Sequence, residues 1–345
     1  MKILIVGDVH WSTYSSIVRS RGKYYSTRLE NLVASINWAE CKALEFNCER
    51  VVYLGDFFDK PDLTSEELTA LSEIKWSNLP HYFLVGNHEA SVKSLIYNSV
   101  EALRKIPNMM IIRDISSLKI TPETELIFIP YITEDDRKPL QDYIPDKNVK
   151  NKIIFSHNDI KGLQLGMFQS KDGFEIEEIE NNCTCFLNGH IHNGQSFCKN
   201  GINLGNLTGQ NFGENAFKYN HSAYILDTDQ LVLSQIENPH AFNFYQFEIN
   251  AIEDINKLYS LRNNAVVSIK TLKSLLSEVK EKIKTCTNIV ESRIIIKPEI
   301  VKSEENVTLQ KLNNVDHLVQ FSICVKEKLG DTEEVNAELS KILRR

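Results

Sequence analysis

The chain has 345 residues, of which 42% are hydrophobic and 25% charged, and its formal net charge at pH 7 is −7. This is the composition of a globular protein with room for one large domain or two, and no apolar run approaches the roughly 20 residues that span a bilayer. The negative charge excludes a surface that attracts nucleic acid over its whole area, so any contact with DNA is expected to be local or shared with a partner.

The cysteines and the first residues bear on the compartment. Seven cysteines, an odd number without a regular framework, predict a reducing environment and a cytoplasmic protein. The opening MKILIV is too short for the core of a signal peptide and is interpreted as a first strand.

Up to about residue 240, short apolar runs alternate with stretches of helical spacing. The runs predict strands at 1–6, 50–56, 81–86, 109–114, 125–130, 152–157 and 183–189. Several are apolar almost throughout, as strands covered on both faces are. Helices are predicted at 27–47 and 91–106. Together these elements predict a layered α/β domain over residues 1–240, with helices against a buried sheet.

The pattern changes after residue 240. Strands predicted at 265–270 and 292–300 flank a helix predicted at 271–285, which indicates a small α+β domain over residues 241–301. The polar stretch that begins the last region, 302–345, is interpreted as a linker, and two amphipathic segments that follow it are expected to be helices. Such helices either fold back on their own domain or dock on another chain.

Polar residues follow five of the predicted strands, at the ends where α/β proteins carry their chemistry. Each such turn is weak evidence alone, and an H-x-H is more often two surface histidines, but five in succession predict one site assembled from five loops. The series is Gly7-Asp8-Val9-His10, Gly55-Asp56-Phe57-Phe58-Asp59, Gly86-Asn87-His88-Glu89, Ser156-His157-Asn158 and Gly189-His190-Ile191-His192.

The donor types in these turns indicate metal ions. Carboxylate, imidazole and amide oxygen without thiolate suit manganese, iron or zinc, and this many donors fit two ions that share a carboxylate. Two ions about 3.5–4 Å apart can generate hydroxide at neutral pH and neutralise charge on a phosphoryl group. The sequence therefore predicts hydrolysis of phosphoesters.

The motif series D-x-H, G-D-x-x-D, G-N-H-[D/E], H and G-H-x-H resembles that of the calcineurin-like metallophosphoesterases over about residues 1–230. The resemblance implies their layered sandwich fold, here followed by a small capping domain and C-terminal helices. It also implies that His88 steers the phosphate and protonates the leaving oxygen, whereas the alternative is a simple turn histidine. For the first ion, the implied ligands are Asp8, His10 and His192. Asp56 is implied to bridge the two ions. For the second ion, the implied ligands are Asn87, His157 and His190.

Two stretches resemble the SbcD-type nucleases within this superfamily. GDFFDK (55–60) is similar to their G-D-[IVL]-F-D, and MKILIVGDVHW is similar to their first residues. Protein phosphatases carry an arginine and a glycine where this chain has Lys60 and Pro61, although Glu89 is their variant of its motif. The chain departs from the SbcD pattern at 203–214, which lacks the proline of a Y-x-G-[ST]-P turn, and this leaves the rim of the site undetermined.

This resemblance implies a DNA nuclease that acts in DNA repair and recombination. It uses two divalent metal ions, and Mn²⁺ is the metal expected. The implied activities are a 3′–5′ exonuclease on duplex DNA and an endonuclease on single strands. The implied partners are DNA ends and an SbcC-type coiled-coil ATPase, in a heterotetramer that contains a homodimer and no membrane. Sequence divergence favours a phage-encoded member, which would act in the host cytoplasm. The alternative is a nucleotide or small-molecule phosphodiesterase that acts alone, and the intact ligand set disfavours a non-catalytic scaffold.

Basic and aromatic residues between Asp8 and the first predicted helix indicate a contact with DNA. A nuclease entrance uses basic groups for phosphates and aromatic rings for splayed bases, and the alternative is a solvated loop with incidental charges. The predicted contacts are Arg19, Arg21, Lys23, Tyr24, Tyr25 and Arg28.

Overall fold

The computed structural model describes residues 1–298 except 16, 91–94 and 166–167. Residues Met1–Lys297 form one compact unit. The linker and the two helices predicted within 302–345 lie outside the described residues. No described helix is both long and apolar enough to cross a membrane.

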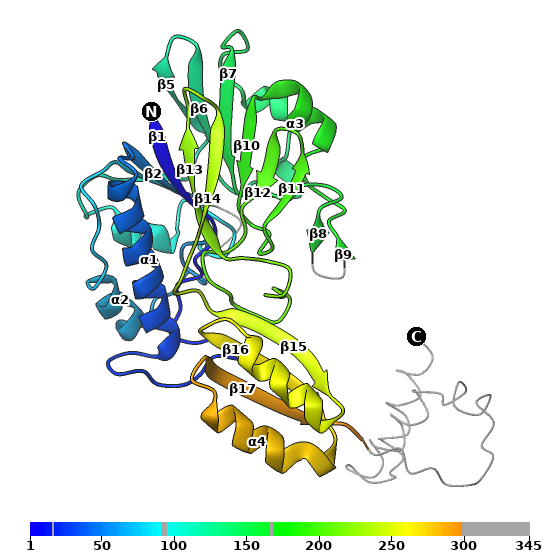
Figure 1. Ribbon diagram of the computed structural model, residues 1–345. Coiled ribbons are helices and arrows are strands. Elements are labelled where there is room, and N and C mark those ends of the chain that lie inside the picture. Colours follow the sequence, from blue (N-terminus) through cyan, green and yellow to red (C-terminus); the bar gives the residue numbers. More distant parts are fainter. Residues whose placement is uncertain (16, 91–94, 166–167, 299–345) are drawn as a thin grey trace, which may run out of the picture. The chain divides into compact units, whose positions relative to one another are not determined.

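Two six-stranded sheets dominate the described part of the chain (Figure 1). In spatial order, the first sheet consists of β14 (Val232–Glu237), β13 (Ser222–Asp227), β1 (Lys2–Val6), β2 (Arg50–Tyr53), β3 (His81–Leu84) and β4 (Met109–Ile112). The second consists of β11 (Gln195–Cys198), β12 (Gly201–Asn203), β10 (Cys185–Asn188), β7 (Asn151–Ser156), β6 (Thr124–Ile129) and β5 (Ser116–Thr121). Strands β1 to β4 are mutually parallel, as are β6, β7 and β10.

The two sheets pack face to face because their strands are apolar on both sides. In β1, Ile3 and Ile5 belong to the core between the sheets, which also contains Phe155 and Leu187 of the second sheet. The alternate β1 residue Leu4 lies in the core under helix α1 (Thr27–Glu45). The outer face of the second sheet is covered by α3 (Ile176–Asn182) and neighbouring turns. The predicted layered α/β sandwich is confirmed.

Helix α1 follows directly from its sequence. The Ser26 hydroxyl accepts a hydrogen bond from the Leu29 backbone N–H, which satisfies a free donor at the helix start. Its apolar stripe is buried against the first sheet and consists of Leu29, Leu32, Ile36, Ala39 and Ala43. The short helix α2 (Ser65–Leu71) begins with a capping box between Thr64 and Glu67.

The prediction of a helix at 91–106 is wrong for residues 95–106, the part of this range that the structure describes. Residues 95–106 contain the short 3₁₀ helix η1 (Ser99–Leu103) in place of a continuous α-helix. The Asn98 side chain accepts a hydrogen bond from the Glu101 N–H and thereby caps this turn. Local capping by a side chain therefore starts a new turn inside a stretch whose apolar spacing resembles one helix.

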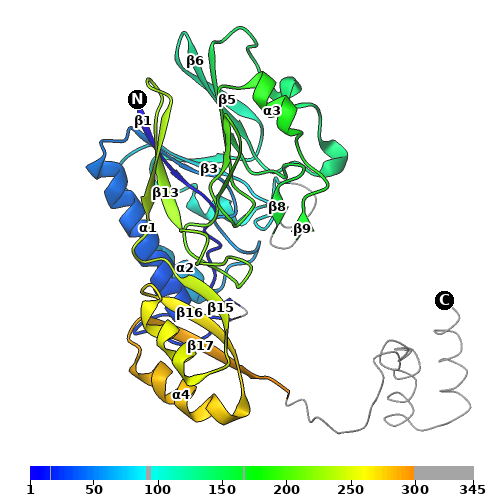
Figure 2. The same cartoon turned by 45° about the vertical axis from the view of Figure 1, so that its right-hand side comes forward.

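A separate sheet of three parallel strands follows the sandwich, in the order β15 (Asn243–Ile249), β16 (Ala265–Thr271) and β17 (Ile289–Ile296). Helix α4 (Leu276–Thr285) connects β16 to β17 and lies beside β17 in both views (Figures 1 and 2). The predicted strand–helix–strand order is present, with β15 added and the helix starting five residues later than expected. The division into domains at residues 240 and 301 stays a prediction.

Candidate metal centre

The predicted ligand residues lie in loops at the carboxyl ends of parallel strands. Asp8 and His10 follow β1, Asp56 follows β2, and Asn87 follows β3, and these strands are neighbours in the first sheet. The remaining ligand residues follow the adjacent strands β7 and β10 of the second sheet: His157, His190 and His192. The carboxyl ends of neighbouring parallel strands meet at one edge of a sheet, and the sandwich brings the two edges together.

The structure brings all seven predicted ligands together in two adjoining groups. In the first cluster (Asp8, His10 and His192), potential ligand atoms lie within 4.8 Å of one another. The second cluster consists of Asn87, His157 and His190, with Asn87 Oδ1 3.3 Å from His157 Nε2 and 3.0 Å from His190 Nδ1. Asp56 forms one such group with His10 and His88, and another with the two histidines of the second cluster.

The donor geometry fits metal ions. His10 Nε2 lies 3.0 Å from His192 Nε2, and His157 Nε2 lies 3.1 Å from Asp56 Oδ2. Two ligands that bind one ion at about 2.1 Å and at right angles stand about 3 Å apart. Asp8 and Asp56 are buried, and Asp8 Oδ2 has no hydrogen-bond partner among the described residues. A buried carboxylate oxygen without a partner is costly, and a cation beside Asp8 Oδ2 would provide one, so this donor set fits two divalent cations.

Electrostatics couple Asp56, the predicted bridge, to the second cluster. Burial acts to raise the pKa of Asp56, but the charge of His157 outweighs it and holds that pKa well below its usual range. Burial likewise acts to lower the pKa of His157, but the carboxylates of Asp56 and Asp8 raise it to about 9. Asp56 Oδ2 and His157 Nε2, 3.1 Å apart, therefore stabilise each other's charge inside the buried centre.

Each ligand imidazole has an outer partner at its second ring nitrogen. His10 Nδ1 lies 3.1 Å from Asp59 Oδ1, and His192 Nδ1 lies 2.9 Å from Glu214 Oε1. For the other two, His157 Nδ1 donates to the Leu54 carbonyl at 2.7 Å, and His190 Nε2 lies 3.3 Å from Asp159 Oδ1. Such partners orient a ligand histidine and raise its basicity.

Sequence patterns do not predict the roles of Glu214 and Asp159. Asp159 follows His157 by two residues, which is the only local signal for it. Glu214 is buried in the long loop after β12, where its carboxylate also accepts hydrogen bonds from Gln210 N and Asn206 Nδ2. A loop of amides and glycines contains no pattern that marks one glutamate as a partner of His192.

Two glycines are required because ligands from other loops approach them closely. A Cβ atom on Gly86 would lie 2.1 Å from Asp56 Oδ1, and one on Gly55 would lie 2.4 Å from His157 Nδ1. Gly55 also has φ of +103°, which favours glycine. Each turn therefore leaves room for a ligand that another loop supplies.

The backbone of the centre adopts uncommon conformations at three predicted ligands. The φ angles of His10, Asp56 and His190 are 52°, 47° and 74°, which for a non-glycine residue costs about 1–2 kcal/mol each. Hydrogen bonds hold these turns: the His10 N–H donates to the Asp56 carbonyl at 2.9 Å, and the His190 N–H donates to Asp8 Oδ1 at 3.0 Å. The strain is therefore distributed over contacts between loops.

His88 lies at the edge of the centre with its side chain 40% exposed. Its backbone N–H donates to Asp56 Oδ1 at 3.0 Å, and its Nδ1 donates to the Asp59 carbonyl at 3.1 Å. Because Nδ1 carries the proton that this carbonyl accepts, Nε2 is the nitrogen available for exchange with a substrate.

Glu89, the residue after His88, is a structural part of the centre. Its buried carboxylate accepts the Gly86 N–H at 2.6 Å and the Phe58 N–H at 3.0 Å, and so joins the loops after β3 and β2. Burial and the nearby charge of Asp56 raise the pKa of Glu89 to about 8.

The predicted DNA contacts in the stretch 11–28 include one residue that is buried and others that lie at the surface. Arg28 is fully buried, and its guanidinium donates to the carbonyls of Gly209, Val9 and His10. The prediction that Arg28 binds DNA is therefore wrong: the side chain fixes the loop that carries His10. A charge pattern in the sequence does not reveal this, because a buried arginine and an exposed one have the same spacing.

The other predicted contacts remain at the surface to different degrees. Arg21 forms an ion pair with Glu66 at 2.6 Å, which offsets its charge, and Tyr25 is half-buried. Arg19, Lys23 and Tyr24 are exposed, with Lys23 Nζ 4.8 Å from the centre of the Tyr24 ring.

The sandwich, the five loops and their donors define a dinuclear-metal phosphoesterase. A model of the calcineurin-like phosphoesterase family matches residues 1–194, more than half of the chain, and the protein belongs to this family. Among solved structures, a dimetal phosphatase from Danio rerio is similar at 12% sequence identity, over 69% of this chain and 96% of that one, with a TM-score of 0.42. No match was found among curated proteins.

Proposed function

We propose that the protein is a DNA nuclease, with 3′–5′ exonuclease activity on duplex DNA and endonuclease activity on single strands, that acts in DNA repair and recombination. The choice of a phosphodiester as the substrate rests on an ion pair made by the loop after β2. Lys60, at the position of the phosphate-binding arginine of protein phosphatases, forms an ion pair with the buried Glu67 at 3.2 Å. A phosphomonoester dianion therefore receives no cationic side chain from this loop, whereas a DNA phosphodiester carries a single charge.

Two divalent ions, with manganese as the proposed metal, would supply a nucleophile at neutral pH and offset the charge of the phosphate when bound. The chain's own residues have separate tasks. The two clusters and Asp56 would hold the ions, and Arg28 fixes the loop of His10. The Asp59 carbonyl accepts a hydrogen bond from the His88 Nδ1–H, which leaves Nε2 for the substrate. In the imidazolium form of His88, Nε2 would carry the proton that passes to the departing sugar oxygen. Exposed Arg19, Lys23 and Tyr24 are the proposed contacts with the DNA strand.

The test compares three substrates with the purified full chain in Mn²⁺. A duplex labelled at one 3′ end, a cyclic nucleotide and a phosphomonoester are incubated with the wild type and with Asp56→Asn, which controls for contaminating enzymes. We expect release of 5′-nucleotides from the duplex only by the wild type. Efficient hydrolysis of the cyclic nucleotide without cleavage of DNA would instead favour a nucleotide phosphodiesterase that acts alone.

We also propose an SbcC-type coiled-coil ATPase as partner, in a heterotetramer with two copies of this chain. The proposal rests on the sequence of 302–345, where apolar residues recur at spacings of three and four, and short helices of this kind are marginal alone in water.

Deletion of residues 303–345 tests this partner. We expect the truncated chain to bind manganese and hydrolyse bis-p-nitrophenyl phosphate, but to lose co-purification with the ATPase and ATP-dependent processing of long duplex ends. Loss of folding after the deletion would indicate that the helices cover their own domain. Unchanged capture of the ATPase would contradict the docking role.

A further inference from the structure

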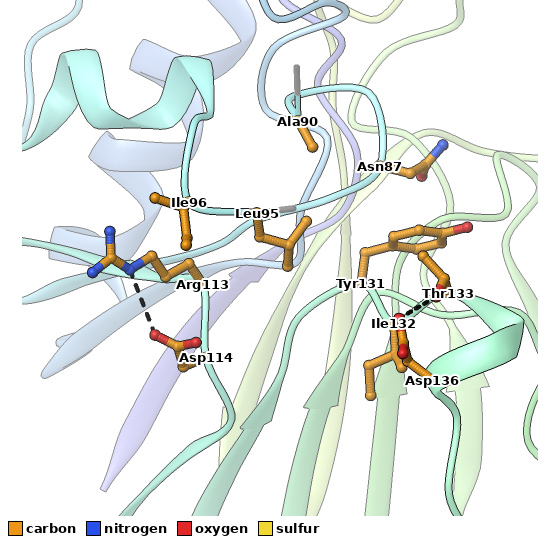
Figure 3. A pocket seen from close by; sticks show the side chains of 10 residues that line it. All are labelled: Asn87, Ala90, Leu95, Ile96, Arg113, Asp114, Tyr131, Ile132, Thr133 and Asp136. Atoms are coloured by element: carbon orange, nitrogen blue, oxygen red, sulfur yellow. Dashed lines mark hydrogen bonds and ion pairs between the residues drawn. The ribbon is translucent and has the colours of Figure 1, made fainter. Parts of the chain in front are cut away.

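A cavity of about 430 Å³ adjoins the metal centre (Figure 3). It is lined by the loops that follow β3, β4 and β6, and Asn87 of the second cluster forms part of its wall. Its volume lies within the range of small-ligand pockets, about 300–1,000 Å³. The cavity is therefore large enough for one small organic group beside the reacting phosphate.

Tyr131 forms a wall of the cavity close to His190 of the second cluster. Its ring centre lies 5.8 Å from that of His190, and Figure 3 shows the ring between Asn87 and Thr133. The backbone around the ring is fixed: the Tyr131 N–H donates to the Val85 carbonyl at 3.0 Å, and the next N–H donates to the buried Asn158 side chain at 2.9 Å. The aromatic face is thus held at a set position relative to the metal ligands.

The remaining walls combine apolar and polar groups. Leu95 and Ile132 supply apolar contacts. At the rim, Thr133 donates to Asp136 at 2.7 Å, and the Arg113 guanidinium lies 3.5 Å from Asp114. A flat aromatic group that offers donors and acceptors along its edge, and a face for stacking, matches these walls. Nucleobases have this chemistry, and stacking on an aromatic side chain tolerates any base.

We propose that this cavity binds the base of a nucleotide adjoining the scissile phosphate, stacked on Tyr131, an inference that rests on the proposed nuclease function. The base fixes the position of the sugar–phosphate relative to Asn87 and His190. Recognition of the base would select a polynucleotide over a phosphorylated protein. Tyr131 is then a specificity-determining residue that contacts substrate and takes no part in proton transfer.

The test uses oligonucleotides that carry one abasic residue on the 5′ or the 3′ side of the scissile phosphate. For the wild type in Mn²⁺, we expect one of the two abasic substrates to be cleaved with kcat/KM about 5- to 100-fold below the intact substrate, the factor that stacking of one base contributes. Tyr131→Ala should lower kcat/KM for the intact substrate until this ratio approaches one. Tyr131→Phe should retain the ratio, because the ring is kept.

Controls separate stacking from folding. Tyr131→Leu keeps an apolar side chain without the ring and should also lose the ratio, while manganese binding measured by calorimetry reports whether the centre is intact. Tyr97→Ala removes an exposed ring that does not line the cavity, so the ratio should stay at the wild-type value. A wild type that cleaves intact and abasic DNA equally, or a ratio retained in Tyr131→Ala, would overturn the base site alone. A wild type that cleaves no oligonucleotide at all would instead contradict the proposed nuclease.

Discussion

The two clusters of the metal centre are held by different kinds of group. In the first cluster, His10 and His192 each face a carboxylate, Asp59 at 3.1 Å and the buried Glu214 at 2.9 Å. In the second cluster, His157 faces a backbone carbonyl, and His190 faces the partly exposed Asp159 at 3.3 Å.

This difference indicates in which cluster the outer side chains set the basicity of the ligand histidines. A carboxylate raises the basicity of its histidine and can be removed by a single substitution, whereas a backbone carbonyl depends on the fold. We therefore expect the first cluster to respond to changes in its outer partners, and the second to be comparatively insensitive to them. The second cluster in turn adjoins the cavity with Tyr131, the proposed base site.

The largest loss of metal and activity is expected at Asp56, the carboxylate that the two clusters share. Asp56 groups with residues of both clusters, so Asp56→Asn should lose both metals and nearly all activity. Elemental analysis of the purified variant decides this. Asp59→Asn is the matched control, because Asp59 faces His10 without belonging to a ligand group. It should still contain both metals on elemental analysis, with weaker binding at the first cluster only. Full manganese content in Asp56→Asn would exclude the bridging assignment.

A substitution outside both clusters should separate chemistry from metal binding. His88→Ala removes the proposed proton donor, and the rate should fall by about 10²–10⁴-fold while manganese content and DNA affinity stay near wild type. Single-turnover cleavage of a 3′-labelled duplex measures the rate. Cleavage within a few-fold of the wild type would reduce His88 to a turn residue.

Removal of one carboxylate should act on one cluster. Glu214→Gln keeps the shape of the side chain but removes the charge beside His192, and loss of an outer partner weakens metal binding by about 10–100-fold. Calorimetric titration with Mn²⁺ should then show one weakened site and one near its original affinity. Equal weakening of both sites would contradict the separation of the clusters.

The smallest effect is expected at the corresponding position of the second cluster. The Asp159 side chain is 24% exposed and lies farther from its histidine, so water can replace part of its role. Asp159→Asn should therefore weaken metal binding by about tenfold or less, at the lower end of such effects. The same titration measures it, and a larger loss than in Glu214→Gln would reverse the proposed order.

The sequence predicted those parts of the molecule that local patterns determine. The apolar runs located the buried strands, and the motifs that follow them named ligands such as Asp8 and His190, because each motif lies within a few residues of its strand. Glu214 could not be found this way, because it lies far along the loop after β12 and the folding of that loop brings it to His192. Tyr131 directly follows a predicted strand, but a single tyrosine there belongs to no ligand motif. Arg28 shows the same limit, because its burial depends on the carbonyls of Gly209 and Val9.

The close approach at Gly55 and Gly86 has a consequence for how this sequence can change during evolution. Any larger residue at either position displaces a ligand that belongs to a different loop, so a compensating change would have to arise elsewhere at the same time. Single substitutions at these two glycines are therefore not tolerated. Leu95 and Thr133 line the cavity and belong to neither ligand cluster, so substitutions at these two positions remove no predicted metal ligand and can accumulate one at a time. A lineage of such proteins can thus exchange one substrate for another while its hydrolytic centre stays the same.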